Sequence, residues 1–511
     1  MSKWKKNKRP EPRKYPGILL GKHPTKDKFL CAYGQTFAML AAEPGSGKGV
    51  GAVVPNLLSF PDSVVVNDPK RENWEITAGF RREMGHECYC FQPESLTTHR
   101  YNPLAYLRTD ALYRVGDIRT IASTLYSPGG DSKNAGWYKK AGDAFTGLVL
   151  FLMETPEMPL TLPQVYELAA APVGVANWIE KTLDDRKKSG RPLSHECERE
   201  LRNFASQRSN PAGFASTEGI LKERLSLFAE KTVANALSGN DFDFRELRKK
   251  KMSIYFCVSQ TALEKFGLLM NLFFTQAIQT NTSVLPSQGG TYPDGTPIIR
   301  YQVLLVMDEL AVMGVINILK TAPALTRAYD VRYLFIFQNK AQLRADSMYG
   351  KEGADAIMKA IQIEMVYAMT DFDAAKEYSD RLGNMTVKNR SESKSYGKGG
   401  SRSKSTSDHV RPLMLPQEIM DMDYGEQLIF ISGNKKSKPL KIKARKIFWY
   451  EEECFKSRAN KPEPFIPTSS EADILNLTIP AVISETGTPK FNAQTQAQIA
   501  AEQAKRTPPV H

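Results

Sequence analysis

A glycine-rich loop near the start of the chain has the residue types that bind phosphate. Its candidate contact residues are Gly45, Ser46, Gly47, Lys48, Gly49 and Val50. Glycines let backbone N–H groups wrap an anionic oxygen, the lysine is spaced to reach terminal phosphates, and a following helix directs its positive end at the ligand. Two positions depart from the usual pattern, because Ala42 replaces the first glycine and Gly49 replaces the hydroxyl residue that contacts Mg²⁺. The alternative is an ordinary strand-to-helix turn.

Two adjacent carboxylates, Asp308 and Glu309, directly follow the apolar run Val303 to Met307. Such a run is typical of a central strand buried on both faces of a parallel sheet, and ligands bind at the carboxyl ends of these strands. We expect Asp308 to hold the Mg²⁺ of Mg-ATP, directly or through a water, and Glu309 to polarise the water that attacks the γ-phosphate. The alternative is an acidic pair that caps the next helix. Together with the glycine loop, the pair favours an ATPase.

Two further residues follow from the geometry of the expected strands. Gln338 ends the strand predicted from Val331, parallel to the one before Asp308, so it should reach the same sheet edge and sense the γ-phosphate or the attacking water. The alternative is a helix-capping or loop amide. Arg327 lies on the connection between these strands, which must return along the sheet, so it should lie far from its own subunit's phosphates. It is either an arginine finger for a neighbouring subunit or a surface arginine.

Length and charge limit the class of protein. The chain has 511 residues, 41% of them hydrophobic, and a formal charge of +13. This length suits two or three domains. Residues 1–28 form a basic arm with ten Lys or Arg against two acidic residues, which suits nucleic acid or an anionic membrane surface. The alternative is a solvated leader. No apolar run approaches the roughly 18 residues of a transmembrane helix.

The cysteine pattern predicts a reducing compartment. Six cysteines are scattered along the chain, and Cys88 and Cys90 form a C-x-C pair with no second pair at zinc-ligand spacing. Alternation along a strand puts both on one face, so buried thiols are favoured over a metal site. We expect a cytosolic location without disulfides.

Alternating strands and helices predict an α/β layer over residues 29–109 and 238–455. Residues 110–237 show only helical patterns and predict an inserted all-α domain. Residues 456–511 form a C-terminal extension, expected to be partly disordered. Ser391 to Asp408 is rich in Ser, Gly, Lys and Arg, which predicts a mobile loop that could touch a polyanion.

In this order along the chain, several stretches make the sequence resemble the coupling ATPases of type IV secretion and bacterial conjugation, relatives of the hexameric cell-division DNA translocases. Beyond the glycine loop and the acidic pair, the matching stretches are Gly17-Ile18-Leu19-Leu20-Gly21, Val65-Val66-Asn67-Asp68-Pro69-Lys70, Arg100-Tyr101-Asn102-Pro103-Leu104, Arg411-Pro412-Leu413-Met414-Leu415-Pro416 and Gly425-Glu426-Gln427-Leu428-Ile429-Phe430. The glycine loop alone is generic, whereas the whole series is specific.

The resemblance implies a RecA-like P-loop domain with a mainly parallel sheet, an inserted all-α domain and a ring of six subunits. By the same resemblance, Lys48 binds the β/γ-phosphates, Asp308 holds Mg²⁺ and Glu309 activates water. Arg327 and Gln338 match the family's trans-acting arginine and sensor glutamine in spacing. Gly49 matches a branch of the family without the hydroxyl residue, which leaves the coordination of Mg²⁺ incomplete.

The implied function is an ATP-hydrolysing coupling protein that recruits a relaxase-bound single strand of DNA, within a relaxosome, and feeds it to the secretion channel. Its partners would include the channel ATPases and inner-membrane components, at the cytoplasmic face of the inner membrane. The alternative is a receptor ATPase that docks secreted proteins, with ATP as an assembly switch. Family members usually carry transmembrane helices ahead of Gly17. Here a basic arm precedes it, so we expect either a separate membrane anchor or a truncated form.

Overall fold

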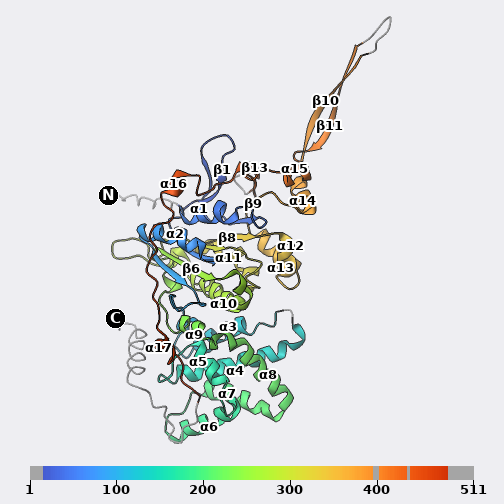
Figure 1. Ribbon diagram of the computed structural model, residues 1–511. Helices are drawn as coiled ribbons and strands as arrows, with labels where there is room; N and C mark the ends of the chain where they lie inside the picture. The colour runs from blue at the N-terminus through green and yellow to red at the C-terminus, as the bar shows by residue number, and fades with distance from the viewer. Residues whose placement is uncertain (1–14, 130, 395–401, 434–437, 482–511) are drawn as a thin grey trace, which may run out of the picture.

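The protein is elongated, with a large sheet in its upper half and a layer of helices below it (Figure 1). The computed structural model describes residues 15–129, 131–394, 402–433 and 438–481. The main sheet has 11 strands in the order β2-β1-β13-β12-β9-β3-β8-β7-β4-β6-β5. These strands are β1 (Ile18–Lys22), β2 (Phe29–Ala32), β3 (Ala38–Ala41), β4 (Ser63–Pro69), β5 (Glu87–Phe91), β6 (Met252–Val258), β7 (Val303–Met307), β8 (Val331–Phe337), β9 (Ile363–Val366), β12 (Glu426–Ile431) and β13 (Leu440–Arg445).

The central strands β9, β3, β8, β7, β4, β6 and β5 run parallel, whereas β12, β13, β1 and β2 join antiparallel at one side. Strands β6, β7 and β8 are buried along their whole length, as an apolar strand covered on both faces must be. The mainly parallel α/β sheet predicted from the sequence is therefore confirmed.

Alternate residues of each strand belong to two different cores. Val64 and Val66 of β4 pack with α1 (Val54–Leu57) and α2 (Glu72–Glu83), and Val65 packs in the core that contains α10 (Leu263–Asn281) and α13 (Gly350–Lys359). Two short helices, α11 (Ala322–Leu325) and α12 (Lys340–Arg344), flank β8 in the sequence. This two-residue alternation is what a strand between two helical layers requires.

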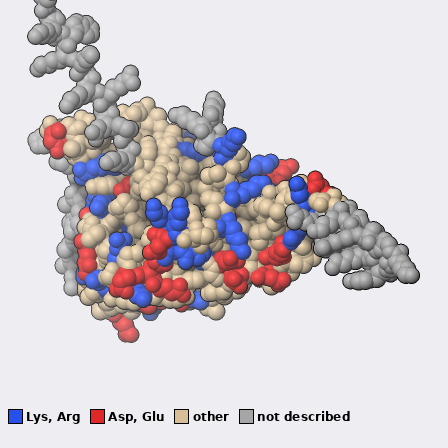
Figure 2. All heavy atoms as spheres, turned by 90° about the horizontal axis from the view of Figure 1, so that it is seen from above, with Lys and Arg blue, Asp and Glu red and all other residues tan. Residues whose placement is uncertain are grey.

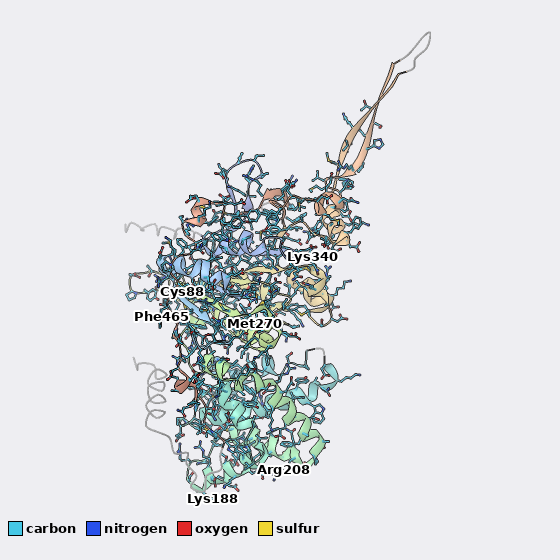
Figure 3. All side chains as sticks on the ribbon, in the orientation of Figure 1. Cys88, Lys188, Arg208, Met270, Lys340 and Phe465 are labelled. Atoms are coloured by element: carbon cyan, nitrogen blue, oxygen red, sulfur yellow. The ribbon has the colours of Figure 1, made fainter. Side chains whose placement is uncertain are left out.

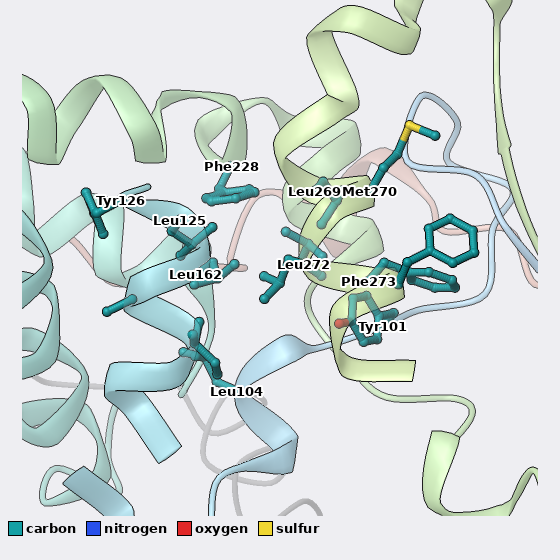
Figure 4. Packing of buried hydrophobic residues seen from close by; sticks show 14 of the residues in the cluster. Tyr101, Leu104, Leu125, Tyr126, Leu162, Phe228, Leu269, Met270, Leu272 and Phe273 are labelled. Carbon is teal, nitrogen blue, oxygen red and sulfur yellow. The ribbon is translucent and has the colours of Figure 1, made fainter. Parts of the chain in front are cut away.

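Between Arg114 and Ala236 the described chain contains helices and no strand. They are α3 (Arg114–Leu125), α4 (Ala135–Met153), α5 (Leu162–Ala169), α6 (Val175–Lys188), α7 (His195–Ser206), α8 (Pro211–Leu225) and α9 (Lys231–Ala236). Figure 4 shows Leu125 and Leu162 of this region beside Leu272 of α10, which covers the sheet. Figure 3 places Lys188 and Arg208 at the end of the region farthest from the sheet. The helical region therefore shares its core with the sheet domain.

A long hairpin corrects the prediction of a mobile loop over Ser391 to Asp408. Strands β10 (Asn384–Lys394) and β11 (Arg402–Pro412) pair antiparallel along their whole length and extend away from the body (Figure 1). Residues 395–401 of the predicted loop lie outside the described residues. Polar β-pairing needs no buried core, so composition alone could not distinguish this hairpin from a loop. The hairpin extends from α14 (Phe372–Leu382) and α15 (Pro416–Met420), which pack with β9 and β12 in a small separate core.

Both ends of the described chain pack against the rest of the protein, which the sequence did not predict. Residues 1–28 were expected to be an arm, but β1 lies within this range and pairs with β2 and β13. After α16 (Glu453–Lys456) the chain runs down one side of the molecule to α17 (Glu471–Ile474), beside the helical region (Figure 1). We call residues 457–481 the strap. Residues 482–511 lie outside the described residues. None of the described helices has the length and apolarity to cross a bilayer.

Candidate functional site

The glycine loop lies at the carboxyl end of β3, between the ends of β8 and β9. Gly45 and Gly47 have φ angles of +75° and +84°, which a side chain would strain. Gly51 N donates to Gly47 O at 2.7 Å, which starts the helical turn Gly49–Val53 that continues into α1. Strand β3, the glycine loop and the helical turn after it therefore form a strand–loop–helix unit with the helix N-terminus at the loop, the arrangement that binds phosphate.

The two carboxylates lie where β7 ends, at the same sheet edge as the glycine loop. The Lys48 ammonium forms an ion pair with Glu309, and their side chains are only 14% and 11% exposed. Glu309 N donates to Asp308 Oδ1 at 3.0 Å. Glu309 has a φ of +56°, a left-handed conformation that is uncommon for a residue with a side chain and is found at functional sites. The structure thus brings together Lys48, Asp308 and Glu309 as the sequence predicted.

Burial governs the electrostatics of this edge. Burial raises the pKa of Asp308 to about 6; Lys48 opposes the rise, and Glu309 adds to it. A carboxyl group with a raised pKa in a site that also contains a lysine is typical of a position that receives a cation or exchanges a proton.

Gln338 directly follows Phe337, which pairs with Ala41 just before the glycine loop. It therefore lies at the same edge as Asp308, as the predicted parallel pairing of β7 and β8 requires. Its Oε1 accepts a hydrogen bond from Gln342 Nε2 at 3.1 Å. A cavity of about 230 Å³ lies beside it, lined in part by Glu43 and Met369. Gln338 thus lies at the carboxyl edge of the sheet and shares this cavity with Glu43, at the start of the glycine loop.

Arg327 lies at the opposite edge of the sheet. It precedes β8 by a few residues, its Nη2 donates to Ala360 O at 2.9 Å, and its guanidinium lies 5.4 Å from the ring centre of Phe37, just before β3. Seven residues of β8 separate the two edges, which is about 20 Å at the usual rise per residue. Arg327 is exposed and cannot reach the glycine loop of its own subunit.

Sequence reasoning assigned no role to Asn67 and Asp68, although both lie in a stretch that carried the family resemblance. Asn67 Nδ2 donates to Asp308 O at 2.5 Å, and its buried Oδ1 has no partner among the described residues. The Asp68 carboxylate accepts from Asn73 N and Trp74 N at 3.1 and 2.8 Å. Burial raises its pKa to about 7. The sequence signal that could have identified them is their position at the end of an apolar run, as for Asp308 and Gln338. The structure then places this strand next to β7.

The residues present fit a nucleotide with Mg²⁺, with one gap. Asp308 is the carboxylate that would hold the metal, and no cluster of three or more metal-binding side chains exists among the described residues. A metal that arrives with phosphate oxygens and waters needs no such cluster. The gap is the hydroxyl residue that Gly49 replaces. An added Cβ at Gly49 would meet no atom within 4 Å, so the site has room for such a side chain.

Comparison with known proteins decides the family. The model of the family described as type IV secretory system conjugative DNA transfer matches residues 4–472. The chain belongs to this family. It is 29% identical over 433 residues to the VirD4 protein of Agrobacterium fabrum, which covers 82% of this chain and 59% of that protein. It is 24% identical over 500 residues to the conjugal transfer protein TraG of Escherichia coli, covering 89% of this chain and 76% of TraG.

The structures of the plasmid coupling protein TrwB share this fold. The form in complex with the ATP analogue ADPNP has a TM-score of 0.59 and 14% identity, and covers 86% of this chain and 89% of TrwB. The form in complex with ADP and Mg²⁺ has a TM-score of 0.57 and 15% identity, and covers 85% and 88%. This chain thus has the TrwB fold. It spans about 59% of the length of the VirD4 relative.

Proposed function

We propose that this chain is the ATP-hydrolysing coupling protein that recruits relaxase-bound single-stranded DNA and feeds it to a type IV secretion channel during conjugation. The observation that carries the proposal is the meeting of Lys48, Asp308 and Glu309 at the carboxyl edge of the sheet, beside the glycine loop. Family membership supports the cargo and the channel, and the ADPNP and ADP–Mg²⁺ complexes of TrwB support ATP and Mg²⁺ as ligands.

The Lys48–Glu309 ion pair suggests how binding prepares hydrolysis. Phosphate oxygens would replace Glu309 as the partner of Lys48, because they carry more charge and lie at the helix N-terminus. Glu309, released from the lysine, would then accept the proton of the attacking water, and Gln338 would orient that water. Asp308 would hold Mg²⁺, which when bound neutralises charge on the phosphate oxygens. The ion pair thus gives each of these nearly buried side chains a partner of opposite charge.

A ring of six subunits is part of the proposal, since Arg327 lies on the edge opposite its own glycine loop. Placed against the site of the neighbouring subunit, its guanidinium would stabilise the charge that develops in phosphoryl transfer. The relaxosome, the channel ATPases and the inner-membrane components are the proposed partners, at the cytoplasmic face of the inner membrane. A separate protein would supply a membrane anchor if this chain has none.

The described residues offer candidate contacts for the proposed path of the DNA. Lys446 belongs to a basic stretch of the sequence but is not a candidate contact, because it is only 5% exposed and its Nζ donates to Ser46 O in the glycine loop at 3.0 Å. On β13, Lys441, Lys443 and Arg445 are exposed instead. This strand lies at the end of the molecule viewed in Figure 2, where Lys and Arg gather toward the middle of the face. These residues and the hairpin β10–β11 are the candidate contacts.

The second candidate function, docking of secreted proteins, is favoured by the charge of the helical region. Residues 110–237 contain sixteen Lys or Arg and sixteen Asp or Glu, so the excess positive charge of the chain lies elsewhere. A charge-balanced surface gives little of the counterion release that drives binding to nucleic acid. The helical region therefore suits a protein partner, whichever cargo the sheet domain moves.

The test is the ATPase rate against protein concentration, with and without single-stranded DNA. We expect a rate that rises with concentration and with DNA. Lys48→Ala should weaken ATP binding, whereas Glu309→Gln should bind ATP and not hydrolyse it. DNA affinity should fall with salt, with a log–log slope of about −0.7 per phosphate contact on single strands. Wild-type hydrolysis by Glu309→Gln would refute the site, and a DNA-independent rate with tight binding of a secreted protein would favour the receptor.

A further inference from the structure

A stack of three aromatic rings lies directly against the glycine loop, and no role has been assigned to it. The rings of Tyr424 and Phe448 are 5.3 Å apart and 5° from parallel, and those of Phe448 and Tyr450 are 5.6 Å apart and 17° from parallel. Phe448 is buried, whereas Tyr424 and Tyr450 are 54% and 42% exposed. We call these three residues the aromatic ladder. Two large, exposed aromatic side chains on a buried third are unusual unless something covers them.

The ladder and the loop form one unit. A Cβ added to Gly47 would lie 2.7 Å from Tyr424 Oη and 3.2 Å from Phe448 Cε1, so the two segments are in contact. Lys446 N donates to Gly425 O at 2.7 Å, and Trp449 N donates to Val50 O at 3.3 Å. These bonds attach the segments that carry the ladder to each other and to the first turn after the loop.

The position of the acidic pair decides on which side of the loop the rest of a nucleotide must lie. Asp308, Glu309 and Gln338 follow β7 and β8, on one side of β3. The γ-phosphate must face these side chains, so the ribose and base leave the loop on the other side. The strands on that side are β9, β12 and β13, and the ladder residues flank β12 and β13. The open tyrosines therefore lie where the base has to go.

We propose that the aromatic ladder is the base-binding subsite of the nucleotide site, with the base stacked on the outer face of one of the two exposed tyrosines, since Phe448 lies between them. The inference rests on the proposed function, because it requires that the loop bind a nucleoside triphosphate. Every base has a π-face, so stacking accepts adenine and guanine alike. The subsite is thus specific for a nucleoside triphosphate over inorganic triphosphate, with little preference between ATP and GTP.

The test compares ligands with and without a base in a Glu309→Gln background, which prevents hydrolysis. The double substitution Tyr424→Ala, Tyr450→Ala should weaken ATP and GTP binding by a similar factor, about five- to 150-fold if stacking has its usual strength. Affinity for inorganic triphosphate should not change. The matched double substitution to Phe keeps both ring faces and should retain ATP affinity. Phe465→Ala, which removes an 81% exposed ring on the strap, is the control for loss of a surface aromatic residue.

The outcomes separate this inference from the proposed function. Equal loss of ATP and inorganic triphosphate in the double Ala variant would mean that the tyrosines only support the loop, and would overturn the subsite. Wild-type ATP affinity in that variant would overturn it as well. If the parent protein bound neither ligand, the proposed ATPase would fail instead. A loss confined to nucleosides, recovered by phenylalanine, is the result that supports the ladder.

Discussion

Arg327→Ala should bind ATP normally but hydrolyse it poorly, and inactive Glu309→Gln subunits should restore part of the activity. Arg327 lies about 20 Å along β8 from the edge that carries Gln338. Its side chain cannot span that distance, so any catalytic role must serve another subunit. Loss of an arginine finger typically costs about 10³–10⁵ in kcat.

The size of the rescue follows from the geometry of a ring. A working interface needs an intact Glu309 on one subunit and an intact Arg327 on the next. With random mixing, the fraction of such interfaces is the product of the two subunit fractions, which peaks at about a quarter for equal amounts in a cyclic assembly. ATPase rate plotted against mixing ratio should therefore be a parabola with zero activity at both ends.

The assay needs proof that subunits exchange, for instance energy transfer between differently labelled chains. Arg327→Lys, which keeps the charge but loses the planar fork, should recover little activity. Because Arg327 also donates to Ala360 O and lies over Phe37, the folding of each variant must be compared by thermal denaturation. With exchange shown and folding intact, a flat line at every mixing ratio would refute the trans role.

Three further predictions use separate features of the site and the strap. Gly49→Ser should fold, because an added Cβ meets no atom within 4 Å. The added hydroxyl should lower the Mg²⁺ concentration needed for half-maximal ATPase activity. Gly49→Ala is the control, and equal Mg²⁺ curves for the two variants would contradict a role for the hydroxyl. In a pH profile, kcat/KM should fall below about pH 6, because the pKa of Asp308 is raised to about 6 and the protonated carboxyl cannot bind Mg²⁺; full activity at pH 5 would exclude Asp308 as the ligand. Gly79→Ala should lower the melting temperature and expose the strap to proteolysis, because its Cβ would lie 2.4 Å from Lys461 O. Gly116→Ala, whose Cβ meets no atom within 4 Å, should be neutral or slightly stabilising.

The sequence determined the sheet core and the chemistry of one edge. Apolar runs long enough to be buried on both faces predicted β7 and β8, and the polar residues directly after these runs predicted the positions of Asp308 and Gln338. The inference works because parallel strands bring their carboxyl ends to one edge, whatever their order along the chain. At the antiparallel side the sequence is less informative, because most residues of β13 (Leu440–Arg445) are exposed and no apolar run marks the strand.

Other contacts were decided only by the tertiary structure, because they join residues far apart in the sequence. The Lys48–Glu309 ion pair spans 261 positions, and the Lys446–Ser46 hydrogen bond spans 400. Lys446 ends a basic stretch of the sequence, yet its side chain is buried. Its burial follows from the turn after β13, which returns the chain to the glycine loop and puts the ammonium 3.8 Å from the ring centre of Tyr367. No local pattern distinguishes such a lysine from an exposed one.

The contacts of the strap and of the aromatic ladder could not be predicted from the sequence either. Glu463 on the strap accepts from Trp74 Nε1 at 2.7 Å, in a segment whose composition predicted only a loose extension. The ladder residues lie in turns, where no periodicity marks a binding surface. Sequence determines which side chains are available and, through strand pairing, which edge they occupy. The partner of each side chain depends on how distant segments pack, because burial and hydrogen bonding are properties of the assembled chain.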